Sequence, residues 1–290
     1  MTVLFWRVAV MCMALLFVGD AAWAAGSDSE PAWYFELVPI GVLLLVVAFV
    51  LGRLPPVEGV THSPAFRKRR VMNWLPLGLT YAFLYMGRYN LKVSKFAFEN
   101  LEGEAEGCVV LMSNADFGNI FTVGVWVYGC SFLINGPLTD RYGGKLAILL
   151  GAAGSAVANL LMGLCAWSLL NQGPMADTIA ENFVPIYSAL YGLNMYFQSF
   201  GAVAIVKCNA PWFHVRERGV FGAIFGILIS LGIYFAFDIG YMIVEDVGVA
   251  EVFFIPAALL AVFFVIDFFG QEIGIGQGHD SGTQVHKAIN

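Results

Sequence analysis

The sequence is poor in charge. Charged residues make up 12% of the 290 residues, about half the level of an ordinary soluble domain. Hydrophobic residues make up 59%, and apolar stretches long enough to cross a bilayer recur along almost the whole chain. This composition excludes a soluble domain of useful size. It predicts an all-α membrane protein that crosses the bilayer several times.

The chain also lacks the residue patterns of metal, redox and hydrolytic sites. Its cysteines are Cys12, Cys108, Cys130, Cys165 and Cys208. Their spacings match no zinc or redox motif, and no glycine-rich phosphate loop or nucleophile–base pair is present. We therefore predict no enzyme activity, no metal and no cofactor. The short basic run Arg67 to Arg70 borders a predicted span and sets topology, so we predict no nucleic-acid partner.

The first 66 residues hold two hydrophobic segments ahead of the main bundle. Residues 1–25 are typical of a secretory signal peptide, with Arg7 before a short apolar core and small residues around Ala24; an uncleaved signal anchor is the alternative. Residues 26–66 contain an extra predicted span, Trp33 to Leu54, with aromatic residues at one interface. We expect this span either to dock a partner or to anchor the chain.

Six more spans are predicted between residues 67 and 270. They lie at Val71–Phe96, Phe117–Leu138, Lys145–Leu169, Phe183–Pro211, Gly219–Val244 and Val252–Phe269. Lys and Arg gather in the loops on one side, and acidic residues occupy the loops on the other. The positive-inside rule then places the mature N-terminus outside and the C-terminus in the cytoplasm. Residues 271–290 are polar and glycine-rich, which predicts a flexible cytoplasmic tail.

Polar residues share one face of the first of these six spans. Tyr81, Tyr85, Arg88, Lys92 and Lys95 fall within an arc of roughly 80° on an α-helix. A cation that faces lipid costs about 2.5–3.5 kcal/mol even on the lenient insertion scale. The face must therefore border water or bind an anion, which predicts a transporter for a small anion. Lys92 and Lys95 either recruit that anion or reach the outer interface by snorkelling.

The connection between the second and third of these spans carries a dense motif, from Gly136 to Lys145. It reads Gly-Pro-Leu-Thr-Asp-Arg-Tyr-Gly-Gly-Lys. Its glycines permit a close helix approach and a tight turn. The motif closely resembles the signature loop of the major facilitator superfamily. That resemblance implies a six-helix half of the fold. It also implies that Gly136, Asp140, Arg141, Gly143 and Lys145 act in gating rather than in substrate contact.

A second resemblance narrows the family. Tyr81, Tyr85, Arg88 and Asn90 match in register the first helix of the organophosphate:phosphate antiporters, the group of glycerol-3-phosphate and hexose-6-phosphate transporters. Further matches are Asn194–Gly201, Trp212-Phe213 and Glu217-Arg218-Gly219. The resemblance implies that Arg88 grips a phosphoryl group, whose oxygens suit the guanidinium fork, and that Tyr81 and Tyr85 line its path. Gln198 is either a pocket residue or a packed amide.

The match is incomplete in ways that leave the substrate open. Tyr89 stands where the glycerol-3-phosphate carriers place lysine, and Ile229 where they have a pocket histidine. Lys207 stands where the relatives carry arginine, and we expect a structural role for it at the inner end. Asp238 is an acid inside a span and therefore a functional candidate, unless it pairs with a lysine or lies near the outer interface.

Members of this family have two six-helix halves, and this sequence holds one. We therefore expect the N-terminal half of an exchanger of phosphate esters or phosphate in the bacterial inner membrane. A second six-helix body must complete it, because alternating access needs two bodies around a shared site. That body is a separate chain or a second copy, unless the reading frame is broken. A membrane sensor of phosphate esters and a non-functional scaffold or remnant are the competing functions.

Overall fold

The structure is a computed structural model that describes Gly41 and residues 63–99, 101–102, 108–109, 111–213 and 218–287. The chain divides into two compact units, residues 1–62 and residues 63–290, and all the described residues except Gly41 belong to the second unit. The predicted signal peptide lies outside the described residues. So does the predicted extra span, Trp33 to Leu54, apart from Gly41.

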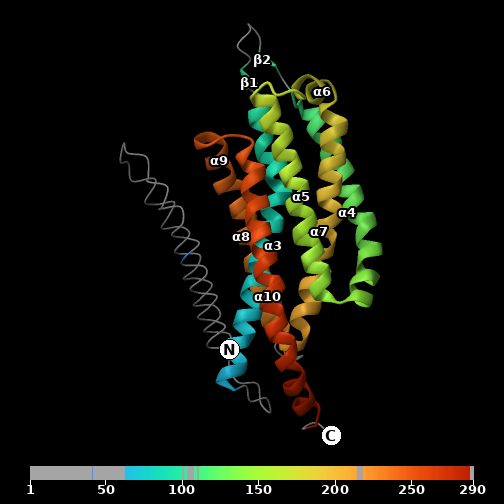
Figure 1. Cartoon of the computed structure of the whole chain (residues 1–290), viewed down its shortest axis with the longest axis vertical. Coiled ribbons are helices and arrows are strands. Elements are labelled where there is room, and N and C mark those ends of the chain that lie inside the picture. Colours follow the sequence, from blue (N-terminus) through green and yellow to red (C-terminus); the bar gives the residue numbers. More distant parts are fainter. Residues whose placement is uncertain are drawn as a thin grey trace, which may run out of the picture. The chain divides into compact units, whose positions relative to one another are not determined.

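The second unit is a bundle of long helices that run side by side (Figure 1). In chain order its helical elements are α3 (Pro64–Glu99), α4 (Asn114–Tyr142), α5 (Gly144–Leu170), α6 (Ala176–Glu181), α7 (Phe183–Asn209), the 3₁₀ turn η2 (Ala210–Trp212), α8 (Arg218–Tyr234), the π-helical turn η4 (Phe235–Ile239), α9 (Gly240–Asp246) and α10 (Glu251–Lys287). A short antiparallel ladder joins β1 (Leu101–Glu102) to β2 (Cys108–Val109), with Leu101 opposite Val109 and Glu102 opposite Cys108. The predicted all-α class and the order of six long helical segments are confirmed.

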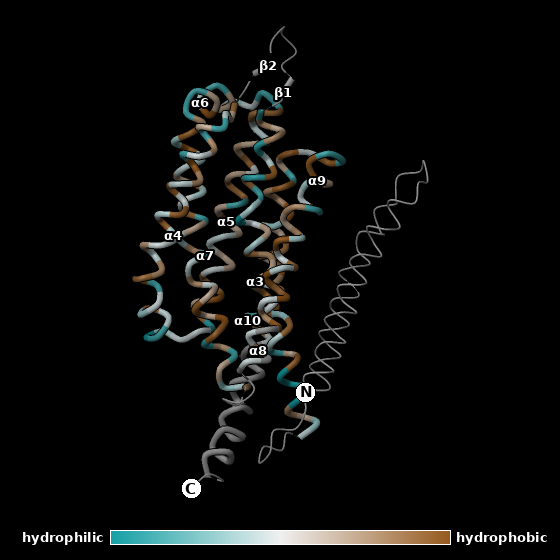
Figure 2. Tube along the Cα trace, turned by 180° about the vertical axis from the view of Figure 1, so that it is seen from behind, coloured by the Kyte–Doolittle hydropathy of each residue, from teal (hydrophilic) through white to brown (hydrophobic). Residues whose placement is uncertain are grey.

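Five of the described helices are long and apolar enough to cross a membrane. They are Asn114–Tyr142, Gly144–Leu170, Phe183–Trp212, Ile224–Asp246 and Glu251–Gly270, which correspond to the second to sixth predicted spans of the bundle. α3, the first predicted span, has 36 residues but is not among them, because polar as well as charged residues lower its hydropathy. In Figure 2 polar residues gather around α6 and at the α4–α5 connection, at opposite ends of the bundle.

Helix packing places α3 and α7 inside the bundle. α7 packs against both α4 and α5, whereas α3 packs against α8, η4 and α10. A Cβ atom added to Gly232 on α8 would lie 2.7 Å from the Ala82 carbonyl oxygen of α3, so glycine permits this close crossing. Near α6, stacked and edge-on rings of Phe98, Phe183 and Tyr187 fill the core. The polar helix α3 is thus enclosed by more apolar neighbours.

The backbone of α10 stays helical to Lys287, whereas the sequence predicts a flexible tail from residue 271. Extending an existing helix fixes one residue for each new backbone hydrogen bond, unlike starting a new helix. A polar segment can therefore continue a helix that apolar packing has already formed.

Candidate anion-binding site

Arg88 lies in the C-terminal half of α3, and its side chain is half-buried. Its Nε donates a hydrogen bond to Oε1 of Gln198 on α7 at 2.9 Å. The guanidinium carbon lies 4.8 Å from the ring centre of Tyr85 and 4.5 Å from that of Tyr128 on α4, within the range of cation–π attraction. Side chains from α3, α4 and α7 therefore meet around one cation.

Arg88 has no carboxylate partner among the described residues, because its neighbours are an amide and three tyrosines. Neutral partners satisfy donors but leave the positive charge uncompensated. Nε donates to Gln198, and the guanidinium also has a side-chain hydrogen-bond interaction with Tyr128. Its other N–H donors can meet the oxygens of a phosphate, which a guanidinium suits. An uncompensated cation inside a bundle of spanning helices favours binding of an anion.

Gln198 is fully buried and is held in place by further amides. Its Nε2 donates to Oδ1 of Asn194 at 3.0 Å, and Asn194 Nδ2 donates to the Gly87 carbonyl oxygen at 2.8 Å. Asn159 on α5 donates to Asn194 Oδ1 at 3.3 Å and accepts a hydrogen bond from Asn90. We call Gln198, Asn194, Asn159 and Asn90 the amide relay. Because it occupies the Gln198 donor, the relay turns the Gln198 oxygen toward Arg88.

The backbone beside Arg88 is fixed by the same neighbours. A Cβ atom added to Gly87 would lie 2.9 Å from Nδ2 of Asn159, so glycine at this position lets α5 approach α3. Tyr191 on α7 donates from its hydroxyl to the Arg88 carbonyl oxygen at 3.1 Å. Two successive carbonyls of α3, those of Gly87 and Arg88, thus accept hydrogen bonds from α7. The position of Arg88 is set through backbone as well as side chain.

The two tyrosines predicted to line the path lie on the same side of α3 as Arg88. Tyr85 contacts the guanidinium directly, and Tyr81 lies edge-on to Tyr85 with ring centres 5.2 Å apart. The structure therefore brings Tyr85, Arg88 and Gln198 together and places Tyr81 one ring further along. Their role in binding substrate stays a prediction.

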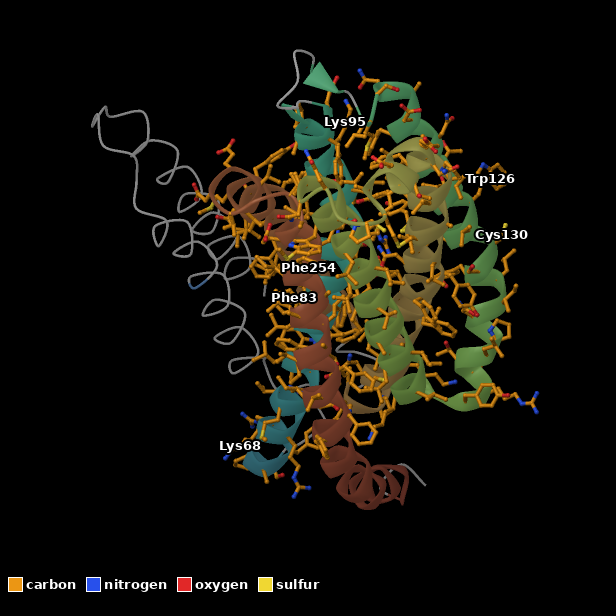
Figure 3. The ribbon with its side chains drawn as sticks, turned by 45° about the horizontal axis from the view of Figure 1, so that its top comes forward. Lys68, Phe83, Lys95, Trp126, Cys130 and Phe254 are labelled. Atoms are coloured by element: carbon orange, nitrogen blue, oxygen red, sulfur yellow. The ribbon has the colours of Figure 1, made fainter. Side chains whose placement is uncertain are left out.

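Lys92 and Lys95 differ in their surroundings. Lys92 is exposed, and its Nζ lies 5.1 Å from the ring centre of Phe237 on η4. Lys95 donates to Asn114 and pairs with Glu99 at 3.5 Å, near the end of α3 that leads to β1 (Figure 3). Lys95 is thus engaged within the chain, which favours an interfacial role, whereas Lys92 stays a candidate for attracting anions.

The signature loop lies at the opposite end of the bundle. Lys207 on α7 donates to Oδ1 of Asp140 and to the Thr139 carbonyl oxygen, each at 2.9 Å. Gly143 has a φ of 94°, a backbone conformation that favours glycine, and its N–H donates to the same Thr139 carbonyl. The loop therefore ties the end of α4 to α7, in keeping with the structural role expected for Lys207.

The other residues of the loop face different surroundings. Arg141 is exposed, and its guanidinium carbon lies 5.6 Å from the ring centre of Tyr142. Lys145 lies 5.4 Å from the ring centre of Phe268 on α10. Gly136 is half-buried, and a Cβ atom added to it would meet nothing within 4 Å, so the close helix approach expected at Gly136 is not found. The close approach lies at Gly144 instead, where an added Cβ atom would be 2.7 Å from Sγ of Cys208 on α7. None of these five loop residues contacts Arg88 in the described hydrogen bonds and ring contacts, which is consistent with their being separate from substrate contact.

Sequence reasoning missed several residues that the structure places in or near the site. Asn159 had a readable signal, because an amide in an otherwise apolar span must find a partner. Tyr128 had none, since aromatic residues are ordinary in such helices. Asp267, a second acid inside a span, was also missed; it is buried and contacts Thr80 on α3. Asp238, which the sequence did single out, is exposed on η4.

The chain is similar in sequence to known membrane proteins. The chain is 23% identical over 181 residues to the glycerol-3-phosphate transporter of Bacillus subtilis, covering 61% of this chain and 36% of that protein. It is also 23% identical to the membrane sensor protein UhpC of Salmonella typhimurium, over 42% of this chain and 24% of the relative, and of Escherichia coli, over 54% and 30%. The chain thus spans about a third or less of the length of these relatives. No solved structure matches it significantly.

These relatives confirm the resemblance to organophosphate:phosphate antiporters drawn from the first helix. A family profile covers a longer part of the chain. The family profile of the Major Facilitator Superfamily matches residues 77–272, which include Arg88, the amide relay and the signature loop. This chain is therefore a member of the Major Facilitator Superfamily.

Proposed function

We propose that this chain binds a phosphate ester or inorganic phosphate at Arg88, as the N-terminal half of an exchanger in the bacterial inner membrane. One observation carries the proposal: a guanidinium inside the bundle has amide and aromatic partners but no carboxylate among the described residues. The likeness to a glycerol-3-phosphate transporter supports a phosphate ester as the anion. The role is binding and transport, not catalysis.

A second six-helix body is part of this proposal, since alternating access requires two bodies around one site. The surface of α4 supports it. Of the most apolar 18-residue stretch of α4, 17% is buried inside the bundle, whereas the corresponding share is 33% to 56% in the other four apolar helices. Trp126, which is 70% exposed, and Cys130 point outward from this helix (Figure 3). We propose that the second body covers part of this face, with the signature loop on the cytoplasmic side.

The test is exchange and binding with Arg88 variants. The purified chain is titrated with glycerol 3-phosphate and with inorganic phosphate by calorimetry, then reconstituted with and without candidate second bodies. Hydrogen bonds to a charged group contribute about 1.5–3 kcal/mol, so Arg88→Ala should weaken binding about 10- to 150-fold. Arg88→Lys should lose less, because it keeps the charge and loses the fork.

The control is Arg141→Ala, which removes an exposed guanidinium at the far loop and should leave the affinity unchanged. Unaltered phosphate binding in Arg88→Ala would refute the proposal. Labelled phosphate uptake against internal glycerol 3-phosphate, seen with a second body and lost in Arg88→Ala, would support exchange.

The second candidate function is sensing of phosphate esters without transport. It is favoured by two relatives whose names describe them as membrane sensor proteins. Both functions need the Arg88 site, so binding alone does not separate them. Saturable binding without exchange, in every combination with a second body, would favour the sensor.

A further inference from the structure

α10 carries an acid inside the bundle that the proposed anion site does not use. Asp267 lies near the end of the apolar segment Glu251–Gly270 and is 2% exposed. Its Oδ2 lies 2.7 Å from Oγ1 of Thr80 on α3. Its Oδ1 is buried without a hydrogen-bond partner. No cation pairs with Asp267 over the part of the chain that the structure describes.

The hydrogen-bonding capacity of Thr80 determines how this contact is made. Oγ1 of Thr80 lies 3.0 Å from the Pro76 carbonyl oxygen and 2.7 Å from Asp267 Oδ2. A hydroxyl has one proton to donate. If Asp267 were ionised, the single Thr80 proton would have to be shared between the two contacts, or one of them would lack a hydrogen bond. If Asp267 is protonated, it donates to Thr80 while Thr80 donates to Pro76, and both contacts are hydrogen bonds.

The absence of a compensating cation among the described residues also favours a protonated Asp267. A buried carboxylate needs a cation or several donors, because removal from water is costly. Asp267 has one hydroxyl neighbour and an oxygen with none, which suits a neutral acid far better than an anion.

The groups around Asp267 come from three helices. α3 presents Thr80, and α7 presents the Cys208 thiol. Lys207, next to Cys208 in the chain, is engaged by Asp140. On α5, Lys145 lies over the ring of Phe268. These surroundings leave Asp267 without an ionic partner in the arrangement described.

We propose that Asp267 is a proton-binding site that couples protonation to the packing of α10 against α3. With the two helices packed, the carboxyl holds its proton and donates it to Thr80. When the helices part and water enters, the O–H bond breaks, the electron pair stays on Oδ2, and the proton passes to a water molecule. The proposal adds a coupling ion to this chain and does not depend on phosphate binding at Arg88.

Infrared spectroscopy of the full chain in lipid nanodiscs tests the proposal directly. At neutral pH the wild-type spectrum should contain a protonated-carboxyl C=O band, which Asp267→Asn should remove. Asp238→Asn, which changes an exposed acid of another span, should retain the band. Thr80→Val should shift the band to higher frequency because it removes the hydrogen-bond acceptor. A wild-type spectrum in which Asp267→Asn removes no such band would overturn the proposal.

Isotope labelling keeps the test decisive if Asp267→Asn fails to fold. Wild-type chain grown with carboxyl-labelled aspartate should show the acid band at a lower frequency, and absence of an isotope-shifted band at neutral pH would overturn the proposal. Arg88→Ala separates the two proposals: it should retain the acid band while losing phosphate binding.

Discussion

Arg88 and Lys207 are two cations in one bundle with opposite kinds of partner. Lys207 lies near the end of α7 and pairs with Asp140 at 2.9 Å, where the Asp140 side chain is 77% exposed. Arg88 lies deeper, between α3, α4 and α7, and receives only neutral partners. Where the chain supplies a carboxylate, the cation joins helices. Where it supplies amides and aromatic rings, the positive charge stays uncompensated and can attract an external anion.

The largest expected effect comes from giving Arg88 a carboxylate partner, as Lys207 has in Asp140. Gln198→Glu would place a carboxylate beside the Arg88 Nε and create an internal ion pair. A buried opposite charge would compensate the guanidinium and repel an incoming anion. Phosphate binding should fall at least as far as in Arg88→Ala, which calorimetry on the purified chain measures.

The matched variant Gln198→Met keeps a similar volume and adds no charge. It should weaken binding less than Gln198→Glu, because the guanidinium loses a partner but stays uncompensated. Equal affinities for wild type and Gln198→Glu would contradict the contrast between the two cations.

An intermediate effect is expected from breaking the amide relay away from Arg88. Asn194→Leu removes the acceptor of Gln198 and the donor to the Gly87 carbonyl. Buried polar groups left unsatisfied cost about 1–3 kcal/mol, so the melting temperature in detergent should fall. Phosphate binding should weaken about 3- to 10-fold, because a misoriented Gln198 gives up about 0.7–1.4 kcal/mol, within the net range of one hydrogen bond.

The control for this variant is Asn135→Leu. Asn135 is also a buried amide, but it donates to Ser199 and to the Tyr196 carbonyl, outside the relay. It should cost similar stability and leave phosphate affinity unchanged. If both variants lowered affinity equally, the relay would have no special part in positioning Arg88.

The smallest expected effect comes from giving Lys207 a neutral partner, as Arg88 has in Gln198. Asp140→Asn removes the carboxylate of an exposed ion pair, which contributes about 0.2–1 kcal/mol. Stability should change little, and phosphate binding to the purified chain should not change. A large loss of binding in Asp140→Asn would show that the two cations are not independent. Exchange with a second body measures the gating role separately.

Much of the fold was predictable because it depends on local patterns. Apolar length predicted the six helical segments, and the glycines Gly143 and Gly144 marked the turn between α4 and α5. Positions on α3 were also predictable, since a helix fixes which of its residues share a face. Partners across helices were not: Tyr128 and Asn159 reach α3 only because α4, α5 and α7 pack as they do. The argument for a protonated Asp267 likewise needs the contact between Thr80 on α3 and Asp267 on α10, together with the Thr80–Pro76 contact within α3.

The π-helical turn η4, Phe235–Ile239, has a consequence for comparison with related chains. A π turn holds one residue more than the α-helical turn it replaces, so everything from Gly240 onward is rotated by about 100° relative to an unbroken helix. A relative with a regular helix here would align correctly only if one residue were left unmatched between Tyr234 and Gly240. Without that gap, faces deduced for α9 from such a relative would be assigned to the wrong side.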